Sequence, residues 1–128
     1  MRDRLFEQGL KVRKQVLGAS YVDKQFKNAD AFSLPMQVLA TKSAWGMVWT
    51  RPGLPRHTRS LITVAMMVAL NRADEFRLHV RAAFNNGVTR DQIKEVLLQT
   101  AIYCGVPAAN TAFHLAEEVF AQMEQAPR

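Results

Sequence analysis

Hydrophobic residues recur with a helical period along almost the whole chain. No segment alternates apolar and polar residues over four or more positions, as a half-buried strand would. The pattern therefore predicts an all-α subunit with about six to seven helices. The predicted helices are residues 3–16, residues 21–29, a third from Ser33 and Pro35 through Trp45, residues 56–71, residues 73–85, a sixth from Thr89 to Tyr103, and a seventh that begins near Pro107.

Local signals mark where these helices begin and end. Gly18 and Gly105 each follow a periodic segment and are typical of a helix stop. Gly46 is expected to weaken the third helix. Thr89 stands three residues before Gln92, which matches a capping box at the start of the sixth helix. Residues 50–55 contain two prolines, so we expect a rigid connection there rather than a flexible linker.

The predicted fourth helix, RHTRSLITVAMMVALN, is basic in its first turn and apolar on all sides thereafter. A helix that is hydrophobic all round is usually buried on every side. A short chain has few places to bury one completely. We therefore expect another subunit to cover part of its surface.

The chain has 128 residues, of which 48% are hydrophobic and 22% charged, a composition that predicts one globular domain over residues 1–128. Cys104 is the one cysteine, so the chain has no intrachain disulfide or CxxC pair, and no base lies next to it in sequence. The N-terminal residues lack the apolar core of a signal peptide, and the longest apolar stretch, residues 61–70, is about half of a bilayer span. We expect a cytoplasmic protein without membrane contact.

The net charge of +6 raises the possibility of a nucleic-acid partner. The positive charge is dispersed, however, and no run of five basic residues occurs. The densest basic patch is Arg51, Arg56, His57 and Arg59, and two prolines interrupt it. Such a patch suits a small anion pocket better than a surface that follows a phosphate backbone, so we predict no nucleic-acid partner. His57 could bind an anion at a helix N-terminus or lie in a solvated first turn.

His79 is the strongest candidate for chemistry. It falls within the apolar stripe of residues 73–85, so a polar side chain is predicted to point inward. Glu75 precedes it by one helical turn, where a carboxylate can accept a hydrogen bond from one imidazole nitrogen and leave the other available for proton transfer. The pair could equally be one that only stabilises the helix.

The other histidines and aromatic residues give weaker signals. His57, His79 and His114 are far apart in sequence and form no HxxxH or HExxH motif, so we predict no metal site. His114 is expected to have a partly exposed structural role. The aromatic residues Trp45, Trp49 and Tyr103 are more typical of a core or a subunit interface than of a ligand platform.

Several strings together resemble the carboxymuconolactone decarboxylase family, over about residues 16–120. They include VWTRPGL at 48–54, TRSL at 58–61, LHVR at 78–81, NGVT at 86–89 and YCGVPAA at 103–109. The first and last of these are similar to the γ-carboxymuconolactone decarboxylase branch. The resemblance implies an all-helical homo-oligomer, a ring-like hexamer built as a trimer of dimers, with no cofactor. It also implies decarboxylation of γ-carboxymuconolactone to the β-ketoadipate enol-lactone in protocatechuate catabolism. The wider family includes alkylhydroperoxidase D-like proteins with a CxxCxxxH motif, and the two thiol positions would here be Arg72 and Glu75.

The implied substrate carries its own electron sink, because its departing carboxylate lies γ to an unsaturated lactone carbonyl. The protein must then hold a dianion, stabilise the developing oxyanion and protonate the α carbon. The residues that we expect to do this are Arg51 for a substrate carboxylate, Arg59 as a second choice, His79 as the acid–base group, Glu75 to orient it, and Trp45 and Tyr103 as further substrate-binding residues.

Three positions depart from the family pattern and bear on the substrate. They are Lys42, Ser43 and Met47, which we expect beside the pocket. Replacing an acidic or aromatic residue with these would change which anion is accepted. Two alternatives therefore stay open: an enzyme that acts on a different lactone or acid, and a non-enzymatic oligomer that binds anions.

Overall fold

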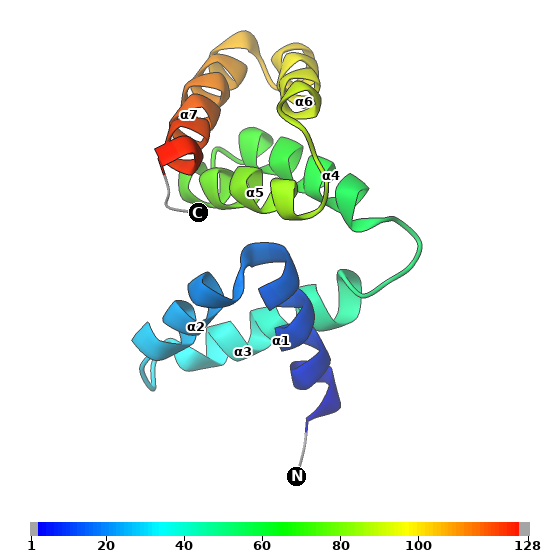
Figure 1. Cartoon of the computed structure of the whole chain (residues 1–128), viewed down its shortest axis with the longest axis vertical. Helices are drawn as coiled ribbons and strands as arrows, with labels where there is room; N and C mark the ends of the chain where they lie inside the picture. Colours follow the sequence, from blue (N-terminus) through cyan, green and yellow to red (C-terminus); the bar gives the residue numbers. More distant parts are fainter. Residues whose placement is uncertain (1–2, 126–128) are drawn as a thin grey trace. The chain divides into compact units, whose positions relative to one another are not determined.

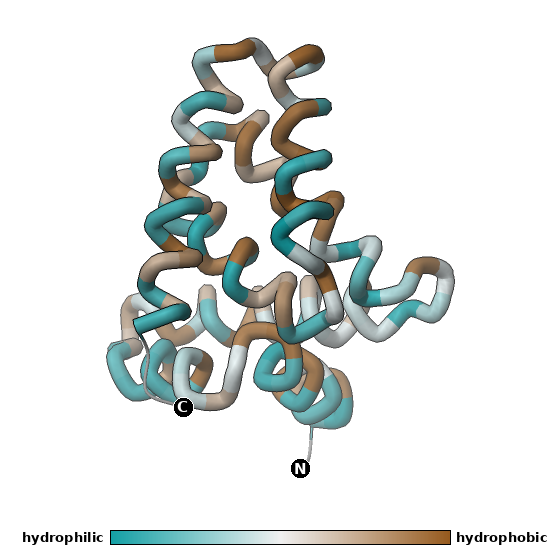
Figure 2. Tube along the Cα trace, turned by 45° about the horizontal axis from the view of Figure 1, so that its top comes forward, coloured by the Kyte–Doolittle hydropathy of each residue, from teal (hydrophilic) through white to brown (hydrophobic). Residues whose placement is uncertain are grey.

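The computed structural model describes residues 3–125 as helices joined by short connections, which confirms the all-helical prediction (Figure 1). Hydrophobic and hydrophilic residues alternate along the successive turns of these helices (Figure 2), as the sequence pattern requires. The chain divides at Pro55 into two compact units. The prediction of a single domain over 1–128 stays a prediction. None of the helices formed by residues 3–125 is long and apolar enough to span a membrane.

Residues 3–55 of the first unit form three α-helices and one π-helix. In chain order they are α1 (Arg4–Leu17), α2 (Ala19–Asn28), α3 (Leu34–Ala40) and the π-helix η1 (Thr41–Val48). Asp3 caps α1 by accepting a hydrogen bond from the backbone N–H of Phe6, at 3.0 Å. Gly18 ends α1 with φ of 94°, a conformation that glycine adopts without steric cost.

The third helix differs from its prediction at its C-terminal half. Its α-helical part ends at Ala40, and the chain then continues as a π-helix through Gly46 to Val48, rather than weakening at Gly46. A π-helix of eight residues is uncommon, since most π-helical segments are single turns. α1 packs directly along η1. Gly9 permits this approach, because a Cβ atom there would lie 2.1 Å from the backbone oxygen of Thr41.

The second unit is a bundle of four helices: α4 (Arg56–Ala69), α5 (Ala73–Asn85), α6 (Arg90–Tyr103) and α7 (Val106–Gln125). Thr89 and Gln92 form the predicted capping box at the start of α6. Gly105, with φ of 105°, separates α6 from α7, and Pro107 is the second residue of α7. These boundaries confirm the predicted capping box and the predicted stop at Gly105, whereas α4 ends at Ala69, before its predicted end at residue 71.

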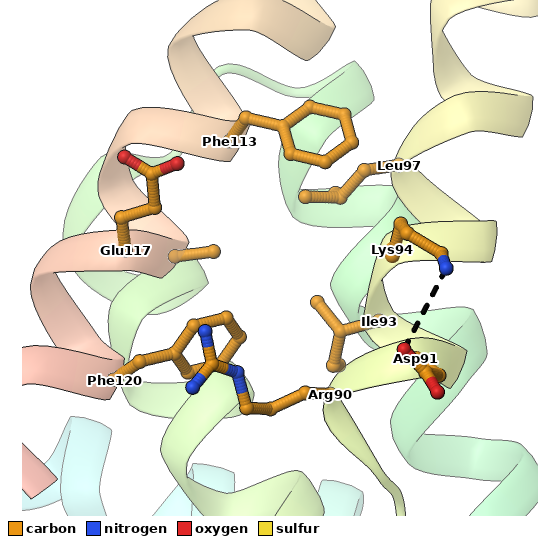
Figure 3. A pocket seen from close by; sticks show the side chains of 9 residues that line it. Arg90, Asp91, Ile93, Lys94, Leu97, Phe113, Glu117 and Phe120 are labelled. Atoms are coloured by element: carbon orange, nitrogen blue, oxygen red, sulfur yellow. Dashed lines mark ion pairs between the residues drawn. The ribbon is translucent and has the colours of Figure 1, made fainter. Parts of the chain in front are cut away.

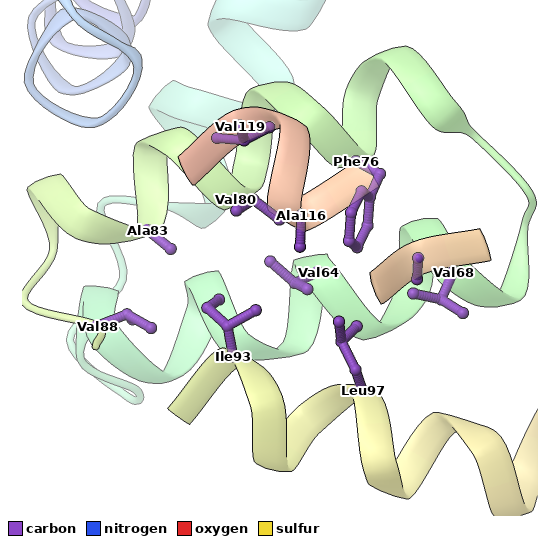
Figure 4. Close-up of a cluster of buried hydrophobic side chains, with 11 residues drawn as sticks. Val64, Val68, Phe76, Val80, Ala83, Val88, Ile93, Leu97, Ala116 and Val119 are labelled. Atoms are coloured by element: carbon purple, nitrogen blue, oxygen red, sulfur yellow. The ribbon is translucent and has the colours of Figure 1, made fainter. Parts of the chain in front are cut away.

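The core of the second unit lies where α4, α5, α6 and α7 face one another (Figure 4). Its buried side chains are Val64, Val68, Phe76, Val80, Ala83, Val88, Ile93, Leu97, Ala112, Ala116 and Val119. The α4 helix contributes Val64 and Val68 to this core, but Ile62 and Met66 on its other side are exposed, as is Leu70 just after its end. These residues form an exposed apolar surface on which another subunit would pack. The predicted subunit contact stays a prediction.

Candidate active site

His79 lies on the inward-facing side of α5, as predicted. It stands between Phe76 and Val80, which are 2% and 0% exposed, and it is itself largely buried. The Nδ1 atom of the imidazole is shielded from solvent. The apolar stripe of α5 is the cause, because a residue three positions after Phe76 falls on the same face of a helix.

Burial changes the acid–base properties of this imidazole. Desolvation disfavours the charged form and lowers the pKa of His79 to about 4, while the negative charge of Glu75 acts in the opposite direction. Burial is the larger effect. His79 is therefore a neutral imidazole at pH 7, with one nitrogen able to donate a hydrogen bond and the other able to accept one.

Glu75 forms an ion pair with Arg72, a contact that the sequence did not predict. Its Oε1 accepts a hydrogen bond from Nη2 of Arg72 at 2.7 Å, and this contact holds the pKa of the Glu75 carboxyl below its usual value. The carboxylate thus stays ionised near His79. A hydrogen bond from His79 to Glu75 stays a prediction. Arg72 and Glu75 thus form a salt bridge at the positions that the two thiols occupy in CxxCxxxH proteins.

His57 connects two helices. Its Nε2 lies 2.9 Å from Oε1 of Gln92, and the same oxygen accepts the backbone N–H of Thr89 at 2.9 Å. Because a carbonyl oxygen only accepts, His57 is the donor. His57 thus joins the start of α4 to the capping box of α6, a role that neither sequence interpretation of this residue included. Arg59 is half-buried two residues later.

Arg51 and the two tryptophans belong to the first unit. Trp45 and Trp49 are 6% and 9% exposed, and their rings stack with centroids 4.9 Å apart and planes inclined by 29°. They are core aromatic residues, as predicted. Arg51 follows them in the exposed segment after η1, with its backbone N–H donating to the carbonyl of Val48 at 3.0 Å. Trp45, Trp49 and Arg51 therefore form one short segment that η1 positions.

Tyr103 is not a core aromatic residue in this chain, because 82% of it is exposed. It lines an apolar cavity of about 440 Å³ between α4 and α6, together with Met66, Val96 and the exposed Cys104. No residue of α5 lines this cavity. The structure thus places Tyr103 and His79 in different surroundings within this unit.

Lys42, Ser43 and Met47 share a groove of the first unit. They line a cavity of about 580 Å³ with residues of α1 and α3, and Nζ of Lys42 pairs with Oδ2 of Asp3 at 2.8 Å. Neither Trp45 nor Arg51 lines this groove. The three residues that depart from the family pattern therefore line a groove that the candidate substrate-binding residues Trp45 and Arg51 do not line.

A smaller cavity of about 210 Å³ lies between α6 and α7 (Figure 3). Phe113 and Phe120 of α7 form one wall, and Arg90 of α6 lies over the Phe120 ring, 4.5 Å from its centroid. None of the predicted site residues lines it. The exposed His114 lies on the same helix, and its structural role stays a prediction. Within residues 3–125, no three His, Cys, Asp or Glu side chains are grouped in a way that could hold a metal ion.

Arg13 is a buried charged residue that the sequence analysis did not single out. It is 6% exposed and belongs to the buried face of α1 with Val12 and Val16. A signal was available in the sequence, since an arginine inside an apolar helical stripe is as unusual as a histidine there. The other basic residues in the first half of the chain made this arginine hard to distinguish from a surface charge.

Comparison with known proteins places the chain in a family. Residues 36–118 match the model of the carboxymuconolactone decarboxylase family. The chain is 52% identical over 122 residues to a 4-carboxymuconolactone decarboxylase of Acinetobacter baylyi, with 95% of this chain and 91% of that protein covered. It is also 45% identical over 120 residues to a nitrosuccinic acid decarboxylase of Metarhizium robertsii, with 94% and 84% covered.

The chain belongs to the carboxymuconolactone decarboxylase family, which confirms the resemblance seen in the sequence. Its near full-length similarity to two decarboxylases also identifies it as an enzyme of the carboxy-lyase class. This outcome removes the non-enzymatic alternative.

Proposed function

We propose that this enzyme decarboxylates γ-carboxymuconolactone, also called 4-carboxymuconolactone, to the β-ketoadipate enol-lactone, without a cofactor, as a step of protocatechuate catabolism. The observation that carries the proposal is an inward-facing, neutral imidazole in a chain that is 52% identical to a 4-carboxymuconolactone decarboxylase. Proton transfer to a carbon atom requires an acid–base group positioned within reach of that atom.

The chemistry of the lactone explains what the protein must supply. When the γ carboxylate leaves as CO₂, its electron pair moves through the double bond to the lactone carbonyl oxygen. A proton must then be added to the α carbon. Fixed hydrogen-bond donors near that oxygen stabilise the charge that develops on it, and this stabilisation is commonly the largest contribution to catalysis.

We assign to His79 both the stabilisation of this carbonyl oxygen and the proton transfer to the α carbon. Its neutral form donates an N–H hydrogen bond at pH 7, and the bound substrate changes its protonation. A dianion placed beside the imidazole favours the imidazolium form and raises the pKa of His79 from about 4. His79 thus becomes a proton donor only when substrate is present. Glu75, which stays ionised through its contact with Arg72, acts in the same direction.

Arg51 is assigned to the carboxylate of the substrate that does not react. An arginine can hold a carboxylate through two parallel N–H···O hydrogen bonds, which fixes its orientation. Arg59 is a second cation for the same dianion, and Trp45 provides an apolar wall.

Self-association into a hexamer is part of the proposal, and the exposed apolar residues of the second unit support it. Met66 on α4 is 53% exposed, and Ile102 and Tyr103 at the end of α6 are 78% and 82% exposed. Apolar side chains grouped in this way are typical of subunit interfaces. A contact of Tyr103 with substrate would then occur at the site of a neighbouring subunit. Light scattering after gel filtration measures the subunit number directly.

A different dicarboxylic acid is the second candidate substrate, because a relative at 45% identity is named a nitrosuccinic acid decarboxylase. Nitrosuccinate also carries two carboxylates, and its nitro group can accept the electron pair that decarboxylation releases. The same cation and the same acid–base group would serve both acids. Residues around the pocket would then decide between them.

Purified protein with each acid, in the presence of a chelator, tests the proposal. Production of CO₂ together with the enol-lactone from γ-carboxymuconolactone is the expected result, and the His79→Gln variant is the control for spontaneous decay of the lactone. Release of CO₂ from nitrosuccinate but not from the lactone would instead select the second substrate. Absence of turnover with the lactone would overturn the main proposal.

A further inference from the structure

The guanidinium of Arg13 is buried in the first unit, and no carboxylate of the described residues pairs with it. The side chain is 6% exposed, and no ion pair among residues 3–125 includes it. Desolvation lowers the pKa of Arg13. Burying a charge without a counter-charge is costly, so a side chain placed in this way must perform a task that an apolar residue could not.

The hydrogen bonds of Arg13 lie at one place in the fold. Its Nη1 donates to Oγ1 of Thr41 at 3.0 Å, and its Nη2 donates to Oε1 of Gln37 at 2.9 Å. The Thr41 hydroxyl in turn donates to the backbone carbonyl of Gln37 at 2.7 Å. The planar fork of one guanidinium thus holds two side chains that are one helical turn apart. The Cζ atom of Arg13 also lies 5.6 Å from the centroid of the Phe26 ring.

Gln37 and Thr41 mark the junction at which α3 becomes η1. Residues before Thr41 are α-helical, and residues 41–48 are π-helical. Thr41 is fully buried, so its hydroxyl depends on protein partners. Because hydrogen bonding between residues five apart is rarely favoured over several turns, a long π-helix needs contacts outside itself to persist. Arg13 and the close approach of α1 at Gly9 are such contacts.

The register of η1 decides where the residues after it point. An α-helix turns by roughly 20° more per residue than a π-helix. If the chain continued as an α-helix from Thr41, this difference would add up at each later side chain. Over the residues up to Trp49 the rotation would exceed a right angle. The Trp45–Trp49 stack and the backbone of Arg51 would then both be displaced.

We propose that Arg13 is a positioning residue, which fixes the register of η1 and through it the Trp45–Trp49 pair and Arg51. Its effect on the tryptophan pair stands on the contacts of the first unit alone. Its effect on substrate rests on the function proposed above for Arg51. Arg13 acts on the tryptophans and Arg51 through its hydrogen bonds to Gln37 and Thr41.

The tryptophan pair itself provides a spectroscopic test. The chain has two tryptophans, and they stack at 4.9 Å, so their coupled transitions give a couplet in the far-UV circular dichroism spectrum. The Trp45→Phe variant defines the spectrum without the couplet. In the Arg13→Met variant we expect the couplet to fall by more than half while helical signal is retained. The Lys11→Met variant removes an exposed cation from the same helix and should keep the wild-type couplet.

Kinetics with γ-carboxymuconolactone extend the test to the site. We expect Arg13→Met to raise KM at least several-fold with a smaller change in kcat, and Arg13→Lys to recover only part of the loss, because lysine lacks the fork. If Arg13→Met does not fold, Thr41→Val removes the same contact and should reduce the couplet in the same way.

The two proposals fail in different ways. A wild-type couplet in a folded Arg13→Met or Thr41→Val variant would overturn the positioning role, whatever the activity. If the wild-type protein does not turn over the lactone, the proposed substrate is overturned. A reduced couplet in the variant would even then support the positioning of the tryptophans. A reduced couplet with unchanged KM would overturn the link from Arg13 to Arg51.

Discussion

The buried imidazole of His79 should make the stability of the protein depend on pH in a way that one substitution removes. In the unfolded chain its pKa has the ordinary value of 6.5, and in the folded chain it is about 4. Between these values the unfolded state binds a proton that the folded state does not, so the free energy of unfolding falls as the pH is lowered through this window. At pH 4 the loss relative to pH 7 is about 3 kcal/mol, since one pKa unit corresponds to about 1.4 kcal/mol.

The change to make is His79→Gln, which leaves a polar side chain that does not titrate. Urea unfolding at fixed protein concentration, measured at several pH values from 7 to 4, gives the free energy of unfolding for each variant. We expect the wild-type value to fall by about 3 kcal/mol more than that of His79→Gln over this range. The comparison of slopes removes any constant cost of the substitution itself.

His114→Gln is the matched control, because it removes an exposed imidazole from α7. Its pH dependence should follow that of the wild type. Parallel curves for wild type and His79→Gln would refute the reasoning, since they would mean that the imidazole of His79 gains its proton as readily in the folded chain as in the unfolded one. The acid–base role assigned to it would then lose its physical basis.

Three other changes test separate parts of the structure. Arg51→Lys keeps the charge but loses the two-pronged contact, so KM for the lactone should rise at least about tenfold, measured by initial rates, and an unchanged KM would remove Arg51 from the site. Gly9→Ala places a Cβ atom 2.1 Å from the Thr41 carbonyl oxygen and should lower the free energy of urea unfolding by about 2 kcal/mol or more. Gly53→Ala, where a Cβ atom meets nothing within 4 Å, is its control, and equal stability of the two variants would contradict this packing. Leu97→Ala should cost about 2–5 kcal/mol in the same assay, because the side chain is 1% exposed, and a loss below 1 kcal/mol would contradict its place in the core.

The helices and their ends could be predicted because local signals determine them. The capping box at Thr89, the stops at Gly18 and Gly105 and the inward face of α5 all depend on residues within a few positions of one another. The change from α3 to η1 could not be predicted in this way. It depends on contacts with α1, such as the one from Arg13 to Thr41, which are 28 residues apart in sequence.

The candidate site was predictable in part for the same reason. Periodicity alone indicates that His79 points inward, and burial then determines its pKa. Periodicity does not identify which neighbouring side chain a carboxylate contacts, and the ion pair of Glu75 with Arg72 was not predicted. Nor could it show that Gln92, a capping residue, also accepts a hydrogen bond from His57 on another helix.

The most direct test of the account is the turnover number of the His79→Ala variant with saturating γ-carboxymuconolactone. Circular dichroism of the same sample would confirm that the variant is folded. General acid–base catalysis contributes at least about 100-fold, so kcat should fall by that factor or more. A folded variant that releases CO₂ from the lactone at the wild-type rate would contradict the assignment of His79 as the proton donor.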